Sequence, residues 1–282
     1  MDNKVLIGII GGSGLGEFSG ARELRRVNLE TPYGKPSDEI VIMEIGGREV
    51  AFLSRHGKGH RYSPGRVPYR ANIWALKKLG VFWCISVSAV GSLQLEIAPE
   101  DFVIPDQIID RTKRRDDSFF EEVVAHASFA YPFNRELRGI ILDSSRDVKD
   151  VKVHDGGTYV CMEGPCFSTR AESELYRSWG ASLVGMTAIP EAKLAMEAEM
   201  AYATIALATD YDCWHESVVS VDEVLGRVKR NTERVREILK ILTGRIPVGR
   251  EHENSAYGCM ANAITGSAGE RFGMLGNFCR GI

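Results

Sequence analysis

Short runs of β-branched and other apolar residues alternate with helix-like segments along most of the chain. The run Phe82–Val90 is almost wholly apolar, as expected for a strand that is covered on both faces. An earlier run, Val5–Ile10, ends in a cluster of glycines. This alternation favours the α/β fold class. Further strands are predicted at Phe102–Ile109, Thr158–Met162, Leu183–Met186 and Thr204–Ala208.

Two strands near the N-terminus form a predicted hairpin. Ile40–Ile45 and Val50–Ser54 flank Gly46-Gly47, a two-residue turn typical of β-hairpins. Because a hairpin joins antiparallel strands, we expect a mixed sheet.

Three segments carry helix signals. Ala71–Leu79 has a helical pattern and stops at Gly80, and Pro190 suits the first position of a helix that we expect to run through Tyr202. Ser220 and Glu223 form a predicted capping box at the start of a longer helix. Its apolar residues, which follow a 3.6-residue period, are Val221, Val224, Leu225, Val228, Val235, Ile238 and Leu242.

These elements predict one domain over residues 1–282, with a central mixed β-sheet flanked by helices. No Pro- or Ser-rich linker divides the chain. Residues 250–282 are rich in glycine and show little periodicity, so we expect a weakly defined C-terminal tail there.

Composition excludes several classes of protein. The hydrophobic fraction of 44% supports a large core and excludes a disordered chain. The net charge of −3 gives no general attraction to nucleic acid or to anionic lipid. No signal peptide and no apolar run near the roughly 20 residues of a membrane span is visible, so we expect a cytoplasmic protein with no membrane partner. The six cysteines lack short paired spacings, which favours reduced thiols over disulfides or a zinc site.

Two glycine-rich segments follow predicted strands. The loop Gly11–Gly16, which includes Ser13, can present backbone N–H groups to an anion, although it matches neither the dinucleotide nor the Walker pattern. A tight turn would produce the same sequence. Arg55 and His56 open the second segment, Arg55–His60, which suits an oxyanion better than zinc because its glycines disfavour the helix that a His-x-x-x-His metal site needs. A solvated basic turn is the alternative.

Other polar groups stand at strand ends. Ser88 and Ala89 come at the end of the apolar strand, and Thr187 precedes the helix opened by Pro190, whose positive end favours an anion. Together with Ser13, Arg55 and His56, these residues predict a site for one small dianion.

Asp210 and Asp212 leave another apolar strand. Two neighbouring carboxylates at the end of a buried strand are costly to ionise together, so one of them can stay protonated and donate a proton. The alternative is a pair of turn caps. Phe167, after a Gly-Pro turn, is expected either in the core or stacked on a flat ligand.

These residues resemble the methylthioadenosine phosphorylase branch of the purine nucleoside phosphorylase family. The resemblance extends over roughly residues 8 to 225 in the order of the family. The matching stretches are Gly11–Leu15, Thr31–Ser37, Arg55–His60, Tyr69–Leu76, Ser88–Leu93, Asp106–Thr112, Glu163–Ser173, Gly185–Ala192 and Thr209–Glu216.

The resemblance implies a nucleoside phosphorylase-like fold that assembles as homotrimers or homohexamers. It implies phosphorolysis of 5′-methylthioadenosine to adenine and 5-methylthioribose 1-phosphate, in purine and methionine salvage, with phosphate as co-substrate and no metal or organic cofactor. The alternative within the family is a phosphorylase for 6-oxopurine nucleosides or methylthioinosine.

The resemblance also implies roles for individual residues. Phosphate would contact Ser13, Arg55, His56, Ser88, Ala89 and Thr187. Asp210 and Asp212 would be catalytic and would face the purine N7 and 6-amino edge. The substrate would further contact Met186 under the ribose, Phe167 and Ser168 beside the base, Val221, Val224 and Leu225 around the 5′-alkylthio group, and His126 from a neighbouring subunit.

The chemistry of these residues supports phosphorolysis, and two departures from the family pattern bear on the substrate specificity. Cleavage of the glycosidic bond places negative charge on the purine, which a protonated Asp210 can quench at N7. Carboxylates accept from a 6-amino group, so we expect adenine nucleosides to be preferred over inosine or guanosine. Cys166 stands where relatives carry Gln or Arg, and the segment between Asp212 and Val221 is shorter than in some relatives, so specificity can differ.

Overall fold

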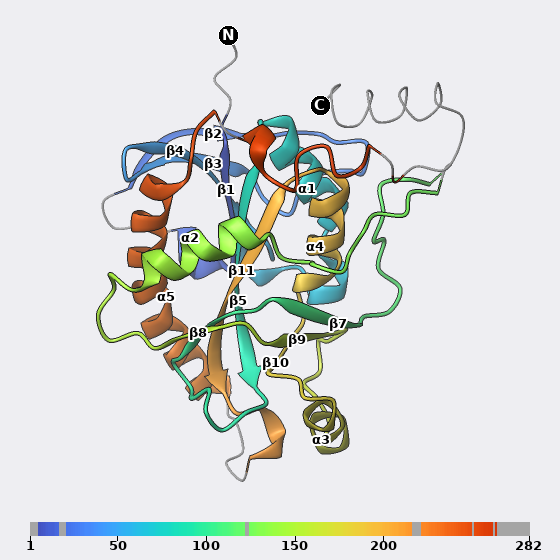
Figure 1. Ribbon diagram of the computed structural model, residues 1–282, viewed down its shortest axis with the longest axis vertical. Helices are drawn as coiled ribbons and strands as arrows, with labels where there is room; N and C mark the ends of the chain where they lie inside the picture. The colour runs from blue at the N-terminus through green and yellow to red at the C-terminus, as the bar shows by residue number, and fades with distance from the viewer. Residues whose placement is uncertain are drawn as a thin grey trace.

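The computed structural model describes residues 5–16, 21–121, 124–215, 221–249, 251–261 and 263, with the side chains of residues 13, 14, 221–225 and 228 outside that description. Within these ranges, eleven strands form one mixed sheet. Helices cover both faces of the sheet (Figure 1). The fold is therefore α/β in a single domain, which confirms the predicted fold class.

Four parallel strands form the centre of the sheet, in the order β4, β1, β5, β11. Their carboxyl ends consequently meet at the same edge. The two longest, β5 and β11, run side by side through the middle of the molecule (Figure 1). The bounds are β1 Ile7–Gly11, β4 Arg48–Ser54, β5 Trp83–Ser92 and β11 Ala201–Asp210.

The remaining strands extend the sheet from this centre. β3 and β2 continue it antiparallel beyond β4, whereas β10, β9 and β7 follow the end of β5, and β6 and β8 continue from β11. β10 runs antiparallel to β5, with Val184 opposite Gly91, so the residues after β10 return along β5. The bounds are β2 Arg22–Val27, β3 Ile40–Ile45, β6 Phe102–Ile104, β7 Gln107–Arg111, β8 Val153–Asp155, β9 Thr158–Met162 and β10 Leu183–Gly185.

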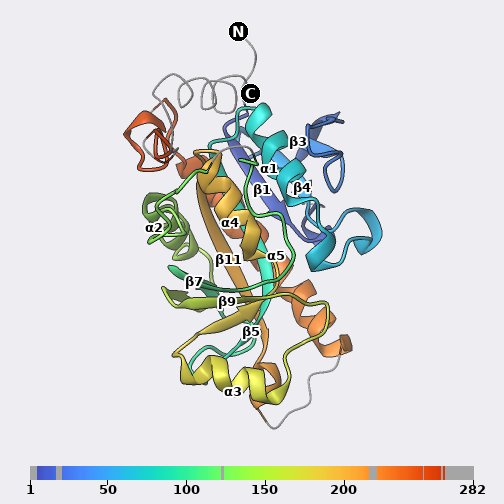
Figure 2. The ribbon, with the colours of Figure 1, turned by 90° about the vertical axis from the view of Figure 1, so that its right-hand side faces the viewer.

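Helices lie on the two faces. α1 (Tyr69–Lys78) and α4 (Ala188–Glu197) cover one face, and α2 (Arg135–Ser145) and α5 (Val221–Arg245) cover the other (Figure 2). α3 (Arg170–Ser178) lies near the end of the sheet formed by β9 and β10. Short 3₁₀ turns are η1 Ser13–Gly16, η2 Lys58–His60, η3 Pro64–Arg66, η4 Asp212–Trp214 and η5 Glu251–Glu253.

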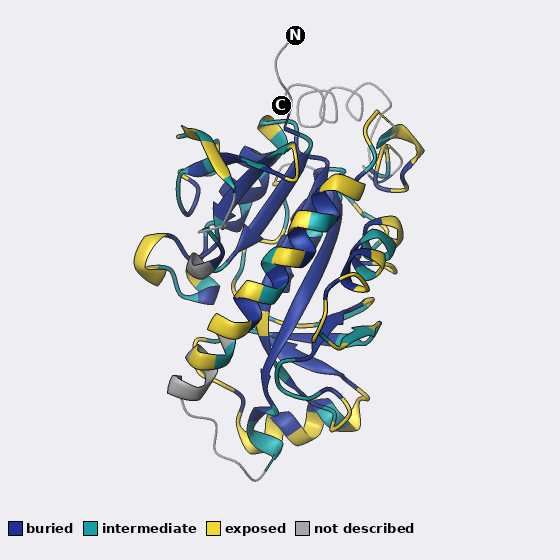
Figure 3. Cartoon of the chain, turned by 90° about the vertical axis from the view of Figure 1, so that its left-hand side faces the viewer, coloured by how far each residue is buried: buried dark blue, intermediate teal, exposed yellow. Residues whose placement is uncertain are grey.

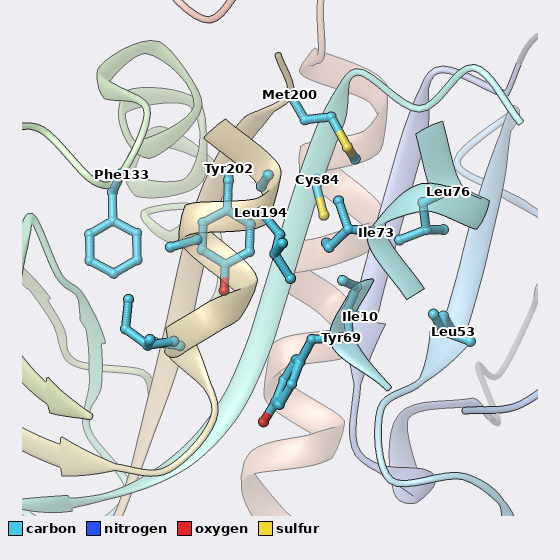
Figure 4. Packing of buried hydrophobic residues seen from close by; sticks show 14 of the residues in the cluster. Ile10, Leu53, Tyr69, Ile73, Leu76, Cys84, Phe133, Leu194, Met200 and Tyr202 are labelled. Atoms are coloured by element: carbon cyan, nitrogen blue, oxygen red, sulfur yellow. The ribbon is translucent and has the colours of Figure 1, made fainter. Parts of the chain in front are cut away.

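Each helix layer buries an apolar cluster against the sheet. Beneath α1 and α4, Ile73, Leu76 and Leu194 pack on strand residues, as Figure 4 shows. Beneath α2 and α5, Leu137 and Ile238 belong to a second cluster. Every residue of β11 is buried, and α5 turns its exposed residues away from the sheet (Figure 3).

The hairpin, the strand Thr158–Met162 and the long C-terminal helix confirm their predictions. The prediction of one strand over Phe102–Ile109 was wrong, because β6 ends at Ile104 and β7 begins at Gln107. Pro105 stands between them and has no N–H for a sheet ladder.

The helix expected from Pro190 through Tyr202 was also too long. α4 ends at Glu197, Glu199 has a positive φ of 52°, and Tyr202 belongs to β11. The predicted cap Ser220 lies outside the described residues. In another capping box, Thr169 accepts from the backbone N–H of Glu172, whose carboxylate accepts in return from the Thr169 N–H.

Part of the segment after residue 250 packs on the domain. Asn254 is buried and bonds through its side chain to Asn134 and Glu136. Met260 is fully buried, and its backbone N–H donates to Glu199. Among the described residues, no helix combines the length and the apolar character that crossing a membrane requires.

The hairpin turn provides a stability test. Gly46 and Gly47 both have positive φ, but a Cβ on Gly46 would lie 2.9 Å from the Lys240 carbonyl oxygen of α5, whereas a Cβ on Gly47 would meet nothing within 4 Å. We expect Gly47→Ala to lower the free energy of unfolding by about 1–2 kcal/mol through backbone strain. Gly46→Ala adds overpacking of roughly 1–3 kcal/mol. Urea unfolding measures both, and equal losses would contradict the packing of this turn on α5.

Candidate active site

The carboxyl ends of the central strands open onto a cavity of about 690 Å³. Small-molecule sites commonly measure roughly 300–1,000 Å³. Its walls come from the second halves of β5 and β11, from the segments after β1, β4, β9, β10 and β11, and from Thr232 of α5. The lining residues with polar or ionisable side chains include Arg55, His56, His60, Arg61, Ser63, Ser88, Ser168, Thr187, Thr209, Asp210, Asp212 and Thr232.

Arg55 follows β4 and is 1% exposed. Its Nε and Nη2 donate to the two carboxylate oxygens of Glu191 at 2.6 and 3.0 Å. Nη1 donates to the Val87 carbonyl at 3.0 Å, and Nη2 also donates to Ser86 Oγ at 2.7 Å. Glu191 thus occupies the Nε–Nη2 edge of the guanidinium, which could otherwise bind an oxyanion with two parallel hydrogen bonds. Nη1 retains one N–H that has no partner among the described residues.

Glu191 is fully buried in the first turn of α4 and was missed by the sequence analysis. It also accepts a hydrogen bond from the Tyr202 hydroxyl at 3.0 Å. Ionised carboxylates are stabilised near a helix N-terminus. The signal that could have revealed Glu191 is a lone carboxylate directly after Pro190, among apolar neighbours that α4 packs on the sheet.

His56 lies beside Arg55 and is buried. Its Nδ1 is 2.8 Å from the Tyr62 carbonyl oxygen, so Nδ1 carries the proton in the neutral ring and Nε2 is an acceptor. The ring stacks on His60, with centroids 4.1 Å apart. Burial and the neighbouring positive charge of Arg55 lower the pKa of His56 to about 4, so the ring is neutral at pH 7.

Ser88, Ala89 and Thr187 meet at the cavity wall because β10 returns along β5. Ser88 Oγ is buried and has no hydrogen-bond partner within the described part of the chain. Thr187 is the N-cap residue of α4, and its side chain makes no capping bond. Ser88 Oγ is therefore available to a ligand, and Thr187 lines the cavity nearby. Ser13 begins η1 next to the lining residue Gly12, but its side chain lies outside the described residues.

Asp210 and Asp212 line another part of the cavity, at the end of β11. Asp210 Oδ2 accepts from Thr209 Oγ1 at 2.7 Å, and its Oδ1 accepts from the backbone N–H of Asp212 at 2.8 Å. Burial raises the pKa of Asp212 above its ordinary value, and the charge of Asp210 raises it further. Both causes favour the protonated form of Asp212, and the neighbouring hydroxyls of Ser173 and Ser168, which favour the ionised form, oppose them.

Gly91 lies directly beneath this pair. A Cβ at position 91 would come within 3.1 Å of Asp210 Oδ1 and 3.2 Å of Asp212 Cβ. The end of β11 is also held from α5, because Arg227 Nη1 donates to the Thr209 carbonyl at 2.8 Å. The two carboxyls are thus positioned by close packing as well as by hydrogen bonds.

Phe167, Ser168 and Met186 also line the cavity. Phe167 is 64% exposed, so it is not a core residue and its ring is available to a ligand. The neighbouring Cys166 is exposed and does not line the cavity.

Other predicted contacts lie elsewhere. His126 is exposed and outside the cavity, and its backbone N–H donates to the Ala263 carbonyl. Val221, Val224 and Leu225 begin α5, but their side chains lie outside the described residues. Sequence reasoning also missed Thr209 and Gly91 as neighbours of the carboxyls.

A model of the phosphorylase superfamily matches residues 6–243 of this chain. The S-methyl-5′-thioadenosine phosphorylase of Saccharolobus solfataricus is 51% identical over 248 residues, which make up 87% of this chain and 92% of that protein. The corresponding protein of Geobacter sulfurreducens is 54% identical over 245 residues, 86% of this chain and 85% of that protein. The chain belongs to the phosphorylase superfamily.

Solved structures agree with this assignment. A methylthioadenosine phosphorylase from an antarctic soil metagenomic library superposes with a TM-score of 0.91 at 46% identity, covering 98% of this chain and 99% of the other. A mutant adenosine/methylthioadenosine phosphorylase from Schistosoma mansoni, in complex with methylthioadenosine, gives a TM-score of 0.86 at 34% identity, covering 93% and 99%. The family and fold implied by the sequence resemblance are thus confirmed.

His56 provides a pH test. Because its folded-state pKa is near 4 and its ordinary value is 6.5, the unfolded chain binds a proton between these pH values that the folded chain does not. The stability contributed by neutral His56 is therefore present above pH 6.5 and is lost as the pH falls toward 4. We expect the Tm of the wild type to fall more between pH 7 and pH 5 than that of His56→Gln. His252→Gln, at an exposed site, should keep the wild-type dependence, and identical slopes for all three proteins would contradict this reading.

Proposed function

We propose that this protein catalyses the phosphorolysis of 5′-methylthioadenosine to adenine and 5-methylthioribose 1-phosphate. The observation that carries the proposal is that one cavity joins the group Arg55, His56, Ser88 and Thr187 to the carboxyl pair Asp210 and Asp212. Such a cavity can hold an inorganic anion and a purine on either side of a sugar. The names of the relatives support the choice of nucleoside.

Phosphate binds among hydroxyls and the remaining Nη1–H of Arg55. One phosphate oxygen attacks C1′ of the ribose, the bond from C1′ to N9 breaks, and its electron pair passes to the purine. The positive charge that develops on the sugar is offset by the bound anion. Ser13, Ala89 and the N-terminus of α4 complete the phosphate contacts, since a helix N-terminus favours an anion.

The carboxyl pair protonates and binds the departing purine. The pair delivers a proton to N7, and general acid assistance of this kind typically contributes about 10²–10⁴ in rate. The raised pKa of Asp212 supports a shared proton at this end of the cavity, in place of the sequence-based assignment to Asp210 alone. A carboxylate oxygen of the pair accepts from the 6-amino group, which favours adenine over a 6-oxopurine.

The remaining substrate contacts are those that the family resemblance implies. Met186 lies under the ribose, and Phe167 and Ser168 lie beside the base. Val221, Val224 and Leu225 surround the 5′-methylthio group, and His126 reaches the cavity of a neighbouring copy. The exposed position of His126, outside the cavity of its own chain, supports assembly as a homotrimer or homohexamer. The reaction uses no metal or organic cofactor and serves purine and methionine salvage in the cytoplasm.

Base release from methylthioadenosine, with and without inorganic phosphate, tests the proposal. We expect adenine to appear only with phosphate, together with 5-methylthioribose 1-phosphate, as liquid chromatography with mass detection would show. Release without phosphate would indicate a hydrolase. Inosine and methylthioinosine serve as parallel substrates, and hypoxanthine released as efficiently as adenine would contradict the role assigned to the carboxyl pair.

Gly91→Ala tests the placement of that pair without touching either carboxyl. The added methyl group requires Asp210 and Asp212 to shift slightly, whereas a misplacement of about 1 Å can cost on the order of 10²-fold in rate. We therefore expect kcat to fall, by less than about 10²-fold, while the protein remains folded. Gly139→Ala in α2, where a Cβ meets nothing within 4 Å, is the matched control and should retain full activity. Wild-type kinetics in Gly91→Ala would show that the carboxyls need no such packing.

A further inference from the structure

Arg115 lies on the loop after β7, and its side chain is 2% exposed although the residues on either side of it are exposed. It is not among the cavity-lining residues, and neither composition nor motif drew attention to it. All five of its N–H groups nevertheless have partners. The position of those partners connects Arg115 to the site.

Four of the partners are carbonyl oxygens at two strand ends. Nη2 donates to Met162 at 3.3 Å and to Glu163 at 2.7 Å, where β9 ends. Nη1 donates to Met186 at 2.8 Å and to Ile189 at 2.5 Å, on either side of Thr187. One guanidinium thus joins the wall segment after β9 to the wall segment after β10.

The fifth partner leads to a third wall segment. Nε of Arg115 pairs with the Glu163 carboxylate at 3.2 Å. Gly65 in η3 packs so closely on that carboxylate that a Cβ there would lie 2.3 Å from Oε1. Nη1 also lies 3.5 Å from the Tyr69 hydroxyl, which donates to the carbonyl of Pro64, a cavity-lining residue.

We propose that Arg115 is a positioning residue for catalysis, which sets the spacing of the three wall segments that carry Met162, Met186, Thr187 and Pro64. Because the segment around Thr187 serves phosphate and ribose while the segment after Met162 leads to Phe167, the same guanidinium aligns both substrates. Its planar fork is needed, since a Lys ammonium cannot hold four carbonyls in one plane. This inference rests on the proposed function for its kinetic readout.

The matched control is Arg138, which also donates to backbone carbonyls and to a carboxylate, but away from the candidate active site. Its Nε donates to the Pro105 carbonyl at 2.9 Å, and its Nη2 donates to the Ile104 carbonyl and to Asp155. It is also mostly buried, with 14% of its side chain exposed, and none of these partners lines the candidate active site. A merely structural role for Arg115 predicts the same phenotype for both arginines.

Arg115→Lys and Arg138→Lys are compared by Tm, by KM for each substrate and by kcat. We expect both variants to lose thermal stability, but Arg115→Lys alone to raise both KM values and to lower kcat/KM by about 10²-fold, the effect of a misplacement near 1 Å. The proposal is overturned if the kinetic constants of the two variants agree. Should Arg115→Lys fail to fold, Glu163→Gln provides a second test, because Glu163 pairs with Arg115 and its side chain is 31% exposed. This variant weakens the clamp, by which we mean Arg115 with its hydrogen-bond partners, and should raise both KM values. Unchanged KM values in Glu163→Gln would equally overturn the proposal.

A measurement of phosphate binding distinguishes a failure of this proposal from a failure of the proposed function. The affinity for inorganic phosphate, measured by isothermal titration calorimetry, requires no turnover and should fall in Arg115→Lys but not in Arg138→Lys. A wild type that binds phosphate yet releases no adenine would refute the proposed function, and a loss of phosphate affinity in Arg115→Lys but not in Arg138→Lys would still support the positioning role of Arg115. Equal phosphate affinity in both variants, beside an active wild type, would refute the clamp alone.

Discussion

The buried ion pair between Arg55 and Glu191 is the interaction on which the geometry of the site depends. Arg55 follows β4, Glu191 belongs to α4, and the same guanidinium binds Ser86 and Val87 of β5 and, at 3.3 Å, the Ile10 carbonyl of β1. Three adjacent strands and the helix over them are thereby tied together beside the cavity. Removing either partner would leave a buried charge unpaired, which is far more costly than the pair itself is stabilising.

This pair also determines how the site can bind an anion. Glu191 balances the charge of Arg55, and the neutral ring of His56 adds none. Of the described lining residues after β4, it is therefore the exposed Arg61, which donates to the Ser37 carbonyl, that retains an unbalanced positive charge. The hydroxyls of Ser88 and Thr187, which line the same cavity, are further hydrogen-bonding groups there.

Much of this site could be predicted from the sequence because its polar residues stand at the ends of apolar strands, where open α/β sheets bind ligands. Arg55, Ser88 and Asp210 were found in that way, and the structure brings them to one cavity. Glu191 and Arg115 could not be found in this way, since Glu191 pairs with Arg55, 136 positions away, and Arg115 donates to the Glu163 carbonyl, 48 positions away. The predicted limits of a strand were wrong where a single residue interrupts it: Pro105 stands between β6 and β7, which had been predicted as one strand. The missed helix α2 begins at Asn134, whose side chain accepts from the Leu137 N–H, an N-cap visible only once the helix is known.

The two ends of the cavity are coupled through charge. The pKa of Asp212 is already raised by burial and by Asp210, and a phosphate dianion entering the same cavity is a further negative charge that disfavours its ionised form. Because Glu191 already balances Arg55, this arginine cancels little of that repulsion. In the proposed phosphorolysis, binding of the nucleophile would help to keep a proton on the carboxyl pair until the purine departs and N7 becomes basic enough to take it. The proposed acid would then be best prepared when both substrates are in place, which would link the buried pair beneath β4 to proton transfer at the end of β11.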